Sequence, residues 1–180
     1  MTREEALKLL DEWVPNKNLQ KHMFAVEAAV LAYARKFGQD EEKWGLAALL
    51  HDADYEKWPE EHPQKIVKKL QSLKVESEIS DAIASHGGKG AIPRKTKLDH
   101  TLFACDELTG LIVATALMYP GKLADVTVER VMKKYKNAGF ARGVNREEVA
   151  KGAEELGVEL QDHVALVLAA MQASAGELGL

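Results

Sequence analysis

The chain has 180 residues, of which 46% are hydrophobic and 29% charged, as in an ordinary globular protein that can bury its own core. Its formal net charge is -4, so a general affinity for nucleic acid is not expected. The single cysteine, Cys105, excludes an internal disulfide, and without an apolar leader or a long apolar segment we expect a cytoplasmic protein that does not enter the membrane.

Apolar residues recur at helical spacing and do not alternate as they would in a strand, which predicts an all-α fold. Thr2 and Glu5 have the spacing of a capping box, Gly38 is placed to end the second helix, and Asp40 is placed to cap the third. In chain order, helices are expected over residues 2–13, 19–37, 40–51, 64–73, 76–86, 98–119, 127–135, from 145 onward, and 161–175. The Pro120-Gly121 pair is expected to end the helix that begins at 98.

Proline, glycine and charged residues mark the predicted loops, of which the longest cover 51–63, 87–97 and 136–145. The second of these loops is basic. No repeat, low-complexity tract or linker divides the chain. We therefore expect one helical domain over 1–180, with its core at about 18–145 and with 145–180 as a candidate appended pair of helices.

Several imidazole and carboxylate side chains are expected to face the apolar interior, because each lies in line with the apolar stripe of its helix or beside it. These residues are His22, His51, His62, His86 and Asp106. Each of them alone is compatible with an ordinary hydrogen-bonded core residue. However, an unpaired buried carboxylate is costly, and a divalent metal shared by Asp52 and Asp106 would remove that cost.

A histidine, a histidine-aspartate doublet and a late aspartate follow one another along the chain as His22, His51-Asp52 and Asp106. Their flanking sequences are HMFAVEAAVLAYARKFG, LAALLHDADYEKWPEEHP and LFACDELTGLI. In order and in flanking sequence, this set resembles the HD superfamily of metal-dependent phosphohydrolases over about residues 20–145, and it is most similar to the small stand-alone HD-domain hydrolases. The resemblance implies a compact helical bundle with a metal site in its core.

Some HD proteins bind two metal ions, and the resemblance then implies that Asp52 bridges them. The other ligands would be His22, His51 and Asp106 for one ion, and His62 and His86 for the other. The short interval between Asp52 and His62 leaves His62 open as a substrate contact or a helix cap, so sites with one ion and with two ions both remain open. Imidazole and carboxylate ligands suit iron, manganese, nickel, cobalt or zinc without choosing among them.

The expected reaction is the attack of a metal-activated water on a small phosphorylated substrate, with a nucleotide as the first choice. Asp52 is expected to orient that water, and Lys57, where similar proteins often carry a lysine, is expected to bind phosphate. Further cationic candidates for substrate binding are Arg94, Lys134 and Arg142. Asp54 and Glu107 are candidate partners that hold a ligand imidazole or the lysine in place.

Two other functions remain open at this point. One is a mixed-valent di-iron oxygenase of HD architecture, which needs iron and both His62 and His86 as ligands. The other is a non-catalytic sensor that binds a nucleotide or a metal. For His100, His163 and Cys105 we expect structural or surface roles, and the sequence gives no indication of the number of subunits.

Overall fold

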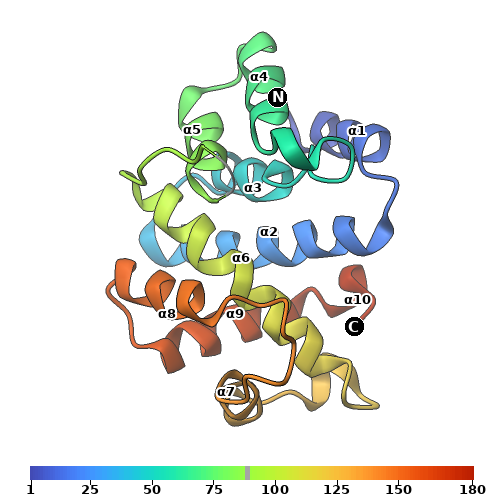
Figure 1. The fold of residues 1–180 in the computed structure, drawn as a ribbon, viewed down its shortest axis with the longest axis vertical. Coiled ribbons are helices and arrows are strands. Elements are labelled where there is room, and N and C mark those ends of the chain that lie inside the picture. The colour runs from blue at the N-terminus through green and yellow to red at the C-terminus, as the bar shows by residue number, and fades with distance from the viewer. Residues whose placement is uncertain (88–89) are drawn as a thin grey trace.

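The computed structural model describes residues 1–87 and 90–180, and in this part of the chain it contains helices and no strand (Figure 1). The α-helices are α1 (Arg3–Trp13), α2 (Lys17–Phe37), α3 (Glu41–Leu50), α4 (Gln64–Ser72), α5 (Ser77–Ser85), α6 (Lys97–Ala116), α7 (Val128–Tyr135), α8 (Arg146–Glu155), α9 (Leu160–Ala173) and α10 (Ala175–Leu178). Two short 3₁₀ helices, η1 (Pro59–Glu61) and η2 (Lys122–Asp125), were not predicted. The all-α prediction is confirmed.

None of the described helices combines the length and the apolar character needed to cross a bilayer. Part of the predicted loop 87–97, at 88–89, lies outside the described residues.

Several helices begin at the capping residues that the sequence indicates. The Thr2 hydroxyl accepts the Glu5 N–H, and the Glu5 carboxylate accepts the Thr2 N–H, which confirms the capping box. The Asp40 carboxylate accepts the Lys43 N–H at the start of α3. Gly38 ends α2 in the left-handed region, with φ of 63°, which a glycine adopts without strain.

Two predicted helix ends are wrong. α6 ends at Ala116 rather than Tyr119, because Tyr119 precedes a proline and that position disfavours the helical conformation. After Ala116 the chain forms turn hydrogen bonds between residues three apart, such as that from the Met118 N–H to the Thr115 carbonyl. The last predicted helix, over 161–175, ends earlier, at Ala173 of α9, and the short helix α10 that follows was not predicted.

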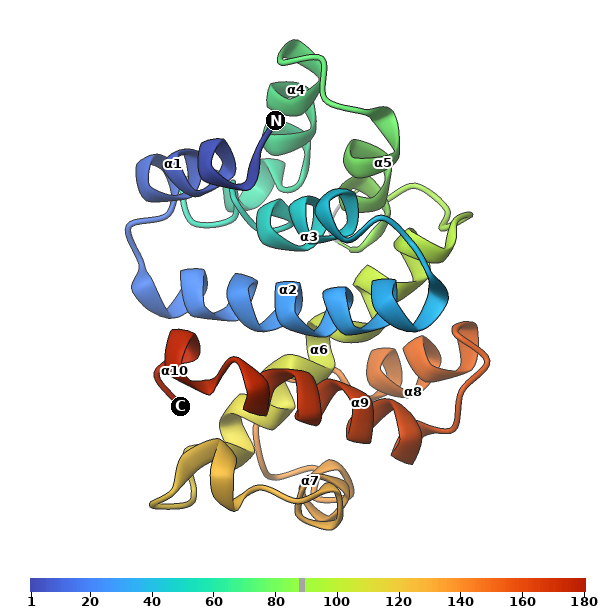
Figure 2. The same cartoon turned by 180° about the vertical axis from the view of Figure 1, so that it is seen from behind.

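The long helix α2 lies at the centre of the packing and contacts α3, α6 and α9. Figures 1 and 2 show α2 across the middle of the molecule, with α1, α3, α4 and α5 on one side and α7 to α10 on the other. α6 crosses α2 obliquely. This crossing, together with the ends of α3 and α5, brings together the segments that carry the candidate metal ligands.

The C-terminal helices pack directly on the helices that carry the candidate site, α8 against α6 and α9 against both α2 and α6. His163 of α9 is buried between them. Its Nε2–H donates to the Ala104 carbonyl at 2.9 Å, and its Nδ1 accepts the Tyr33 hydroxyl at 2.7 Å. Burial lowers the pKa of His163, so the ring is neutral near pH 7 and acts as a structural link.

An ion-pair network connects the segment before α6 to the end of α8. Arg94 donates to both carboxylate oxygens of Glu155, at 2.7 and 2.8 Å, and His100 Nδ1 lies 2.7 Å from the same carboxylate. The guanidinium also lies over the Phe103 ring, 3.7 Å from its centroid. The hydrogen bond from Arg94, with further help from His100, lowers the pKa of Glu155 from 4.5 to about 2.

We expect Glu155→Gln to lower the free energy of unfolding by about 1–2 kcal/mol at pH 7, because the carboxylate of a bidentate pair is lost. Because folding lowers the pKa of Glu155, this stabilisation is complete above pH 4.5 and is lost as the pH falls toward 2. Urea unfolding at pH 7 and at pH 3 measures the difference between the variant and the wild type. Glu154→Gln, on the exposed side of the same helix, is the matched control. A difference that is the same at both pH values would contradict the assignment.

Candidate metal centre

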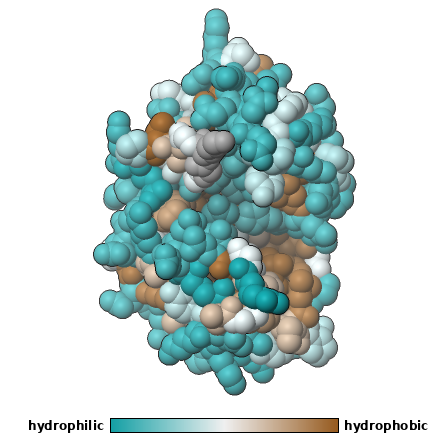
Figure 3. All heavy atoms as spheres, viewed as in Figure 1, coloured by the Kyte–Doolittle hydropathy of each residue, from teal (hydrophilic) through white to brown (hydrophobic). Residues whose placement is uncertain are grey.

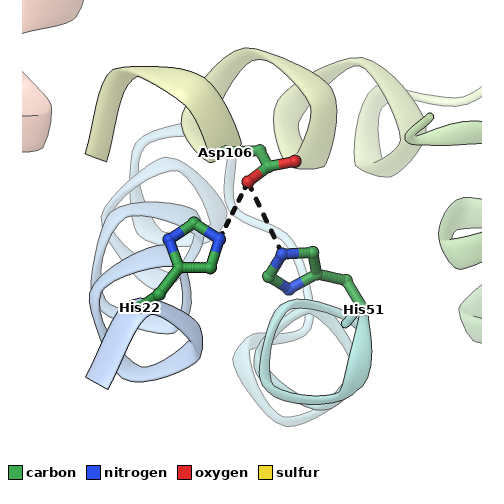
Figure 4. A group of neighbouring side chains, drawn as sticks. All are labelled: His22, His51 and Asp106. Atoms are coloured by element: carbon green, nitrogen blue, oxygen red, sulfur yellow. Dashed lines mark ion pairs between the residues drawn. The ribbon is translucent and has the colours of Figure 1, made fainter. Parts of the chain in front are cut away.

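Six side chains from separate segments converge near the crossing of α2 and α6. They are His22 on α2, His51 and Asp52 at the end of α3, His62 before α4, His86 at the end of α5, and Asp106 on α6. We refer to these six as the candidate ligands. Figure 4 shows three of them, His22, His51 and Asp106, pointing toward one another from three helices.

The two oxygens of Asp52 face different pairs of imidazoles. Its Oδ2 lies 3.8 Å from His22 Nε2 and 3.6 Å from His51 Nε2. Its Oδ1 lies 3.4 Å from His62 Nε2 and 3.6 Å from His86 Nε2. The structure thus places Asp52 between two pairs of histidines.

Asp106 completes the first of these two sets. Its Oδ1 lies 3.0 Å from His22 Nε2 and 3.5 Å from His51 Nε2, the two contacts drawn in Figure 4. The donor atoms of His22, His51 and Asp106 all lie within 4.8 Å of one another. The same is true of His51, Asp52 and His86 among the described residues, whereas His62 joins neither group.

Three of the four imidazoles are held with Nε2 toward the carboxylates. The Nδ1–H of His51 donates to the Ala48 carbonyl at 2.7 Å, and that of His86 donates to the Ile83 carbonyl at 2.6 Å. His62 Nδ1–H donates to the Asp54 carboxylate at 2.7 Å. Because Nδ1 carries the proton in each of these rings, Nε2 presents a lone pair, as a metal-binding histidine requires.

Asp54 is fully buried and is itself held in place. Its second oxygen accepts the backbone N–H groups of Lys65 and Ile66, at 2.9 and 3.0 Å, in the first turn of α4. Asp54 therefore fixes the ring of His62 relative to α4, the partner role that the sequence suggested for it.

The donor set fits a divalent transition metal. His51 Nε2 is buried and has no hydrogen-bond partner in the part of the chain that the structure describes, which costs about 1–3 kcal/mol for a polar group. Donor atoms that share one ion at 2.0–2.2 Å lie about 2.8–3.6 Å apart. Most of the distances among the candidate ligands fall in or near this range, and the mixture of imidazole and carboxylate is typical of zinc, manganese, iron, nickel or cobalt sites.

The charges of the centre favour ionised carboxylates. Burial would raise the pKa of Asp106, but a hydrogen bond from His22 and the neighbouring His51 imidazole outweigh it and hold that pKa well below its usual range. Burial opposes ionisation of Asp52 too, yet the neighbouring imidazoles of His51 and His86 lower its pKa to about 2. Both carboxylates are therefore available as anionic ligands near neutral pH.

The centre opens into a cavity of about 460 Å³, which we call the metal-side cavity. Apart from the candidate ligands, its wall consists of Tyr55, Gly87, Glu107, Gly110, Gly143, Val144 and Glu148. The volume suits a small organic ligand. No lysine or arginine belongs to this wall within the described ranges, whereas two glutamates do.

The structure does not bring the four predicted cationic residues to this cavity. Lys57 Nζ donates to the Glu12 carbonyl at 2.7 Å, because the turn after Asp52 directs it toward α1. The substrate-binding role predicted for Arg94 finds no support, since its guanidinium is paired with Glu155 as described above. Lys134 Nζ lies over the Phe140 ring, and Arg142 is exposed. The loop 136–145 does reach the cavity, but through Gly143 and Val144.

The residues of the cavity wall that were not singled out from the sequence include Tyr55, Gly110 and Glu148. Tyr55 is half exposed, and its ring lies edge-on to His62 with the centroids 5.4 Å apart. Glu148 comes from α8, whose packing on α6 is a tertiary feature. Gly110 alone carried a sequence signal, because it follows Asp106 by one helical turn and so lies on the same face.

We expect Asp54→Asn to weaken metal binding or activity about 10- to 100-fold, because a neutral amide orients the His62 ring less firmly than a carboxylate. Titration calorimetry with Mn²⁺ and Co²⁺ measures the affinity. Asp81→Asn, at an exposed position of α5, is the matched control. An unchanged affinity in the Asp54 variant would show that His62 does not depend on this contact to bind metal.

Comparison with known protein families agrees with this geometry. The family model described as the HD domain matches residues 19–111, which is just over half of the chain and includes all six candidate ligands. No curated protein and no solved structure matches the chain. From the family match, the chain belongs to the HD domain family.

Proposed function

We propose that this protein is a metal-dependent phosphohydrolase that acts on a small phosphate ester. The observation that carries the proposal is the position of Asp52, with one oxygen toward His22 and His51 and the other toward His62 and His86. Two divalent ions would be held there, one with His22, His51 and Asp106 and the other with His62 and His86, and Asp52 would contribute a carboxylate oxygen to each. Membership of the HD domain family, whose members are generally metal-dependent phosphohydrolases, supports the reaction class.

A bound divalent ion supplies a water that ionises near neutral pH and an electrophilic contact for a phosphoryl oxygen. The chain holds the donor atoms ready for this chemistry. Asp52 and Asp106 supply anionic oxygens, and backbone carbonyls and Asp54 set the direction of three imidazoles. Asp52 also lies where its carboxylate can orient the attacking water. Since the cavity wall lacks a basic side chain among the described residues and carries Glu107 and Glu148, it favours a substrate with a single phosphoryl group.

Two measurements on the full chain test the proposal. Elemental analysis of protein purified without added metal is expected to find at least one transition metal ion per chain. A screen of phosphate esters with Mn²⁺ or Co²⁺ is expected to find phosphate release that stops when a chelator is added. The absence of bound metal, together with a His51→Ala variant that takes up metal from solution as the wild type does, would remove the basis of the proposal.

A di-iron oxygenase is the second candidate, because His62 and His86, which that chemistry requires, both lie within 3.6 Å of Asp52 Oδ1. The same preparation separates the two functions. Consumption of oxygen by the iron-loaded protein without phosphate release from any ester would favour the oxygenase. Phosphate release with redox-inactive Zn²⁺ would favour the hydrolase.

A further inference from the structure

A second cavity, of about 540 Å³, adjoins the metal-side cavity and shares His22 and Gly110 with it. Its wall is mainly apolar, so we call it the apolar cavity. The apolar residues of the wall are Val113, Ala114, Leu117, Leu178 and Leu180. Figure 3 shows hydrophobic side chains gathered on this face of the molecule, beside the C-terminal half of α6 and the C-terminus. The polar residues of the wall are exposed: Asn18, Lys21 and Lys122.

The two cavities lie along one face of α6. Gly110 follows Asp106 by four residues, and Ala114 follows Gly110 by four, so the three residues form a row along the helix. On α2, Asn18 and His22 are related in the same way. A molecule bound at the candidate ligands can therefore extend along this face into the apolar cavity.

Gly110 lies where the cavities meet, and the packing of the helix does not require a glycine there. A Cβ at this position would meet only Val144 Cγ2, at 3.7 Å, an ordinary van der Waals distance. Glycine inside a helix is less favourable than alanine by about 1 kcal/mol. Because Gly110 has no side chain, nothing from this residue projects between the two cavities, both of which it lines.

The two cavities differ in chemistry. The wall of the metal-side cavity carries Glu107 and Glu148, which disfavour further negative charge on a substrate beyond one phosphoryl group. The apolar cavity offers hydrocarbon contacts, and Leu117, which is 65% exposed, extends its apolar wall to the surface.

We propose that the apolar cavity binds the alcohol part of the substrate, and that the substrate is a phosphate monoester of an apolar alkyl or aryl alcohol. This proposal rests on the proposed function, since the phosphoryl group must lie at the candidate ligands. In the reaction, a water oxygen forms a bond to phosphorus as the ester P–O bond breaks. The proton of the water passes to the departing alkoxide, so that the products are inorganic phosphate and the free alcohol.

The test compares hydrolysis of n-hexyl phosphate and methyl phosphate by the full chain with Mn²⁺. Each methylene that enters an apolar site raises kcat/KM roughly fourfold when fully buried, so we expect a preference for the hexyl ester of at least about tenfold. Ala114→Phe fills the cavity and is expected to remove most of that preference. Leu117→Asp, at an exposed position, is expected to do the same without a risk to folding. Ala165→Phe, on the exposed side of α9, is the control and should keep the wild-type preference.

A binding measurement separates this proposal from the proposed function. Calorimetry with n-hexylphosphonate, which is not hydrolysed, is expected to give a more negative heat capacity change than methylphosphonate does, and Ala114→Phe should remove the difference. Equal hydrolysis of the two esters, or faster hydrolysis of a nucleotide than of hexyl phosphate, would overturn the proposed substrate class but leave the phosphohydrolase. A different outcome would be that no ester releases phosphate, while the wild type binds hexylphosphonate and the Ala114→Phe variant does not. That outcome would overturn the phosphohydrolase but support an apolar ligand in this cavity.

Discussion

Asp52→Asn is expected to lower the rate of phosphate release about 10³-fold or more, equivalent to about 4 kcal/mol of lost transition-state stabilisation. Asparagine keeps the shape of the side chain but replaces one oxygen with an amide nitrogen, which has no lone pair to offer a metal. In the wild type, each oxygen of Asp52 lies 3.4–3.8 Å from the Nε2 atoms of a different pair of histidines. The substitution therefore removes one oxygen ligand from one of the two histidine pairs, and it removes the negative charge that both pairs face.

Metal content and activity should be measured on the same preparation of the Asp52 variant, with circular dichroism to show that the helices remain. His86→Ala provides a comparison, since its Nε2 lies 3.6 Å from Asp52 Oδ1 and its loss should reduce the metal content from two ions to one per chain. Asp162→Asn, at an exposed position of α9, is the matched control. Full activity and full metal content in the Asp52 variant would exclude a bridging role.

Helix starts could be predicted from the sequence because a cap acts over three or four residues. Thr2, Asp40 and Asn145 each accept a backbone N–H in the first turn that follows, as their positions indicated. Helix ends were less predictable. The end of α6 depends on the constraint that Pro120 places on its neighbour, and the break between α9 and α10 at Ser174 has no strong breaker residue.

The convergence of the six candidate ligands could be predicted because the order of these residues along the chain is a family pattern and their helices are amphipathic. The positions of long cationic side chains could not be predicted. Lys57 follows the doublet closely, but its ammonium group reaches the end of α1, and only the packing of that helix creates this partner. The place of Glu148 in the cavity wall could not be predicted either. This residue of α8 reaches the cavity through the contact between α8 and α6, which the sequence does not indicate.

That contact between α6 and α8 depends on Gly152. A Cβ built on Gly152 would lie 2.6 Å from Ala104 Cα and 2.9 Å from Ala104 Cβ, closer than atoms in proteins approach. Because the first of these atoms belongs to the backbone of α6, one helix must move away from the other. We expect Gly152→Ala to lower the free energy of unfolding by about 1–3 kcal/mol, because the strain exceeds the gain of about 1 kcal/mol in helix propensity.

Urea unfolding measures this loss, and Gly110→Ala is the comparison that isolates its cause. Both glycines lie inside helices, so propensity alone would make both variants more stable. At Gly110 a Cβ has room, 3.7 Å from its nearest neighbour, and we expect a gain of up to about 1 kcal/mol. Opposite signs at the two positions would identify the close approach of α6 and α8 as the cause of the loss. Since α8 also carries Glu148 into the metal-side cavity, the Gly152 variant should show a changed KM as well as lower stability. A Gly152 variant as stable as the wild type would mean that the two helices lie further apart than a Cβ distance of 2.6 Å to the Ala104 Cα implies.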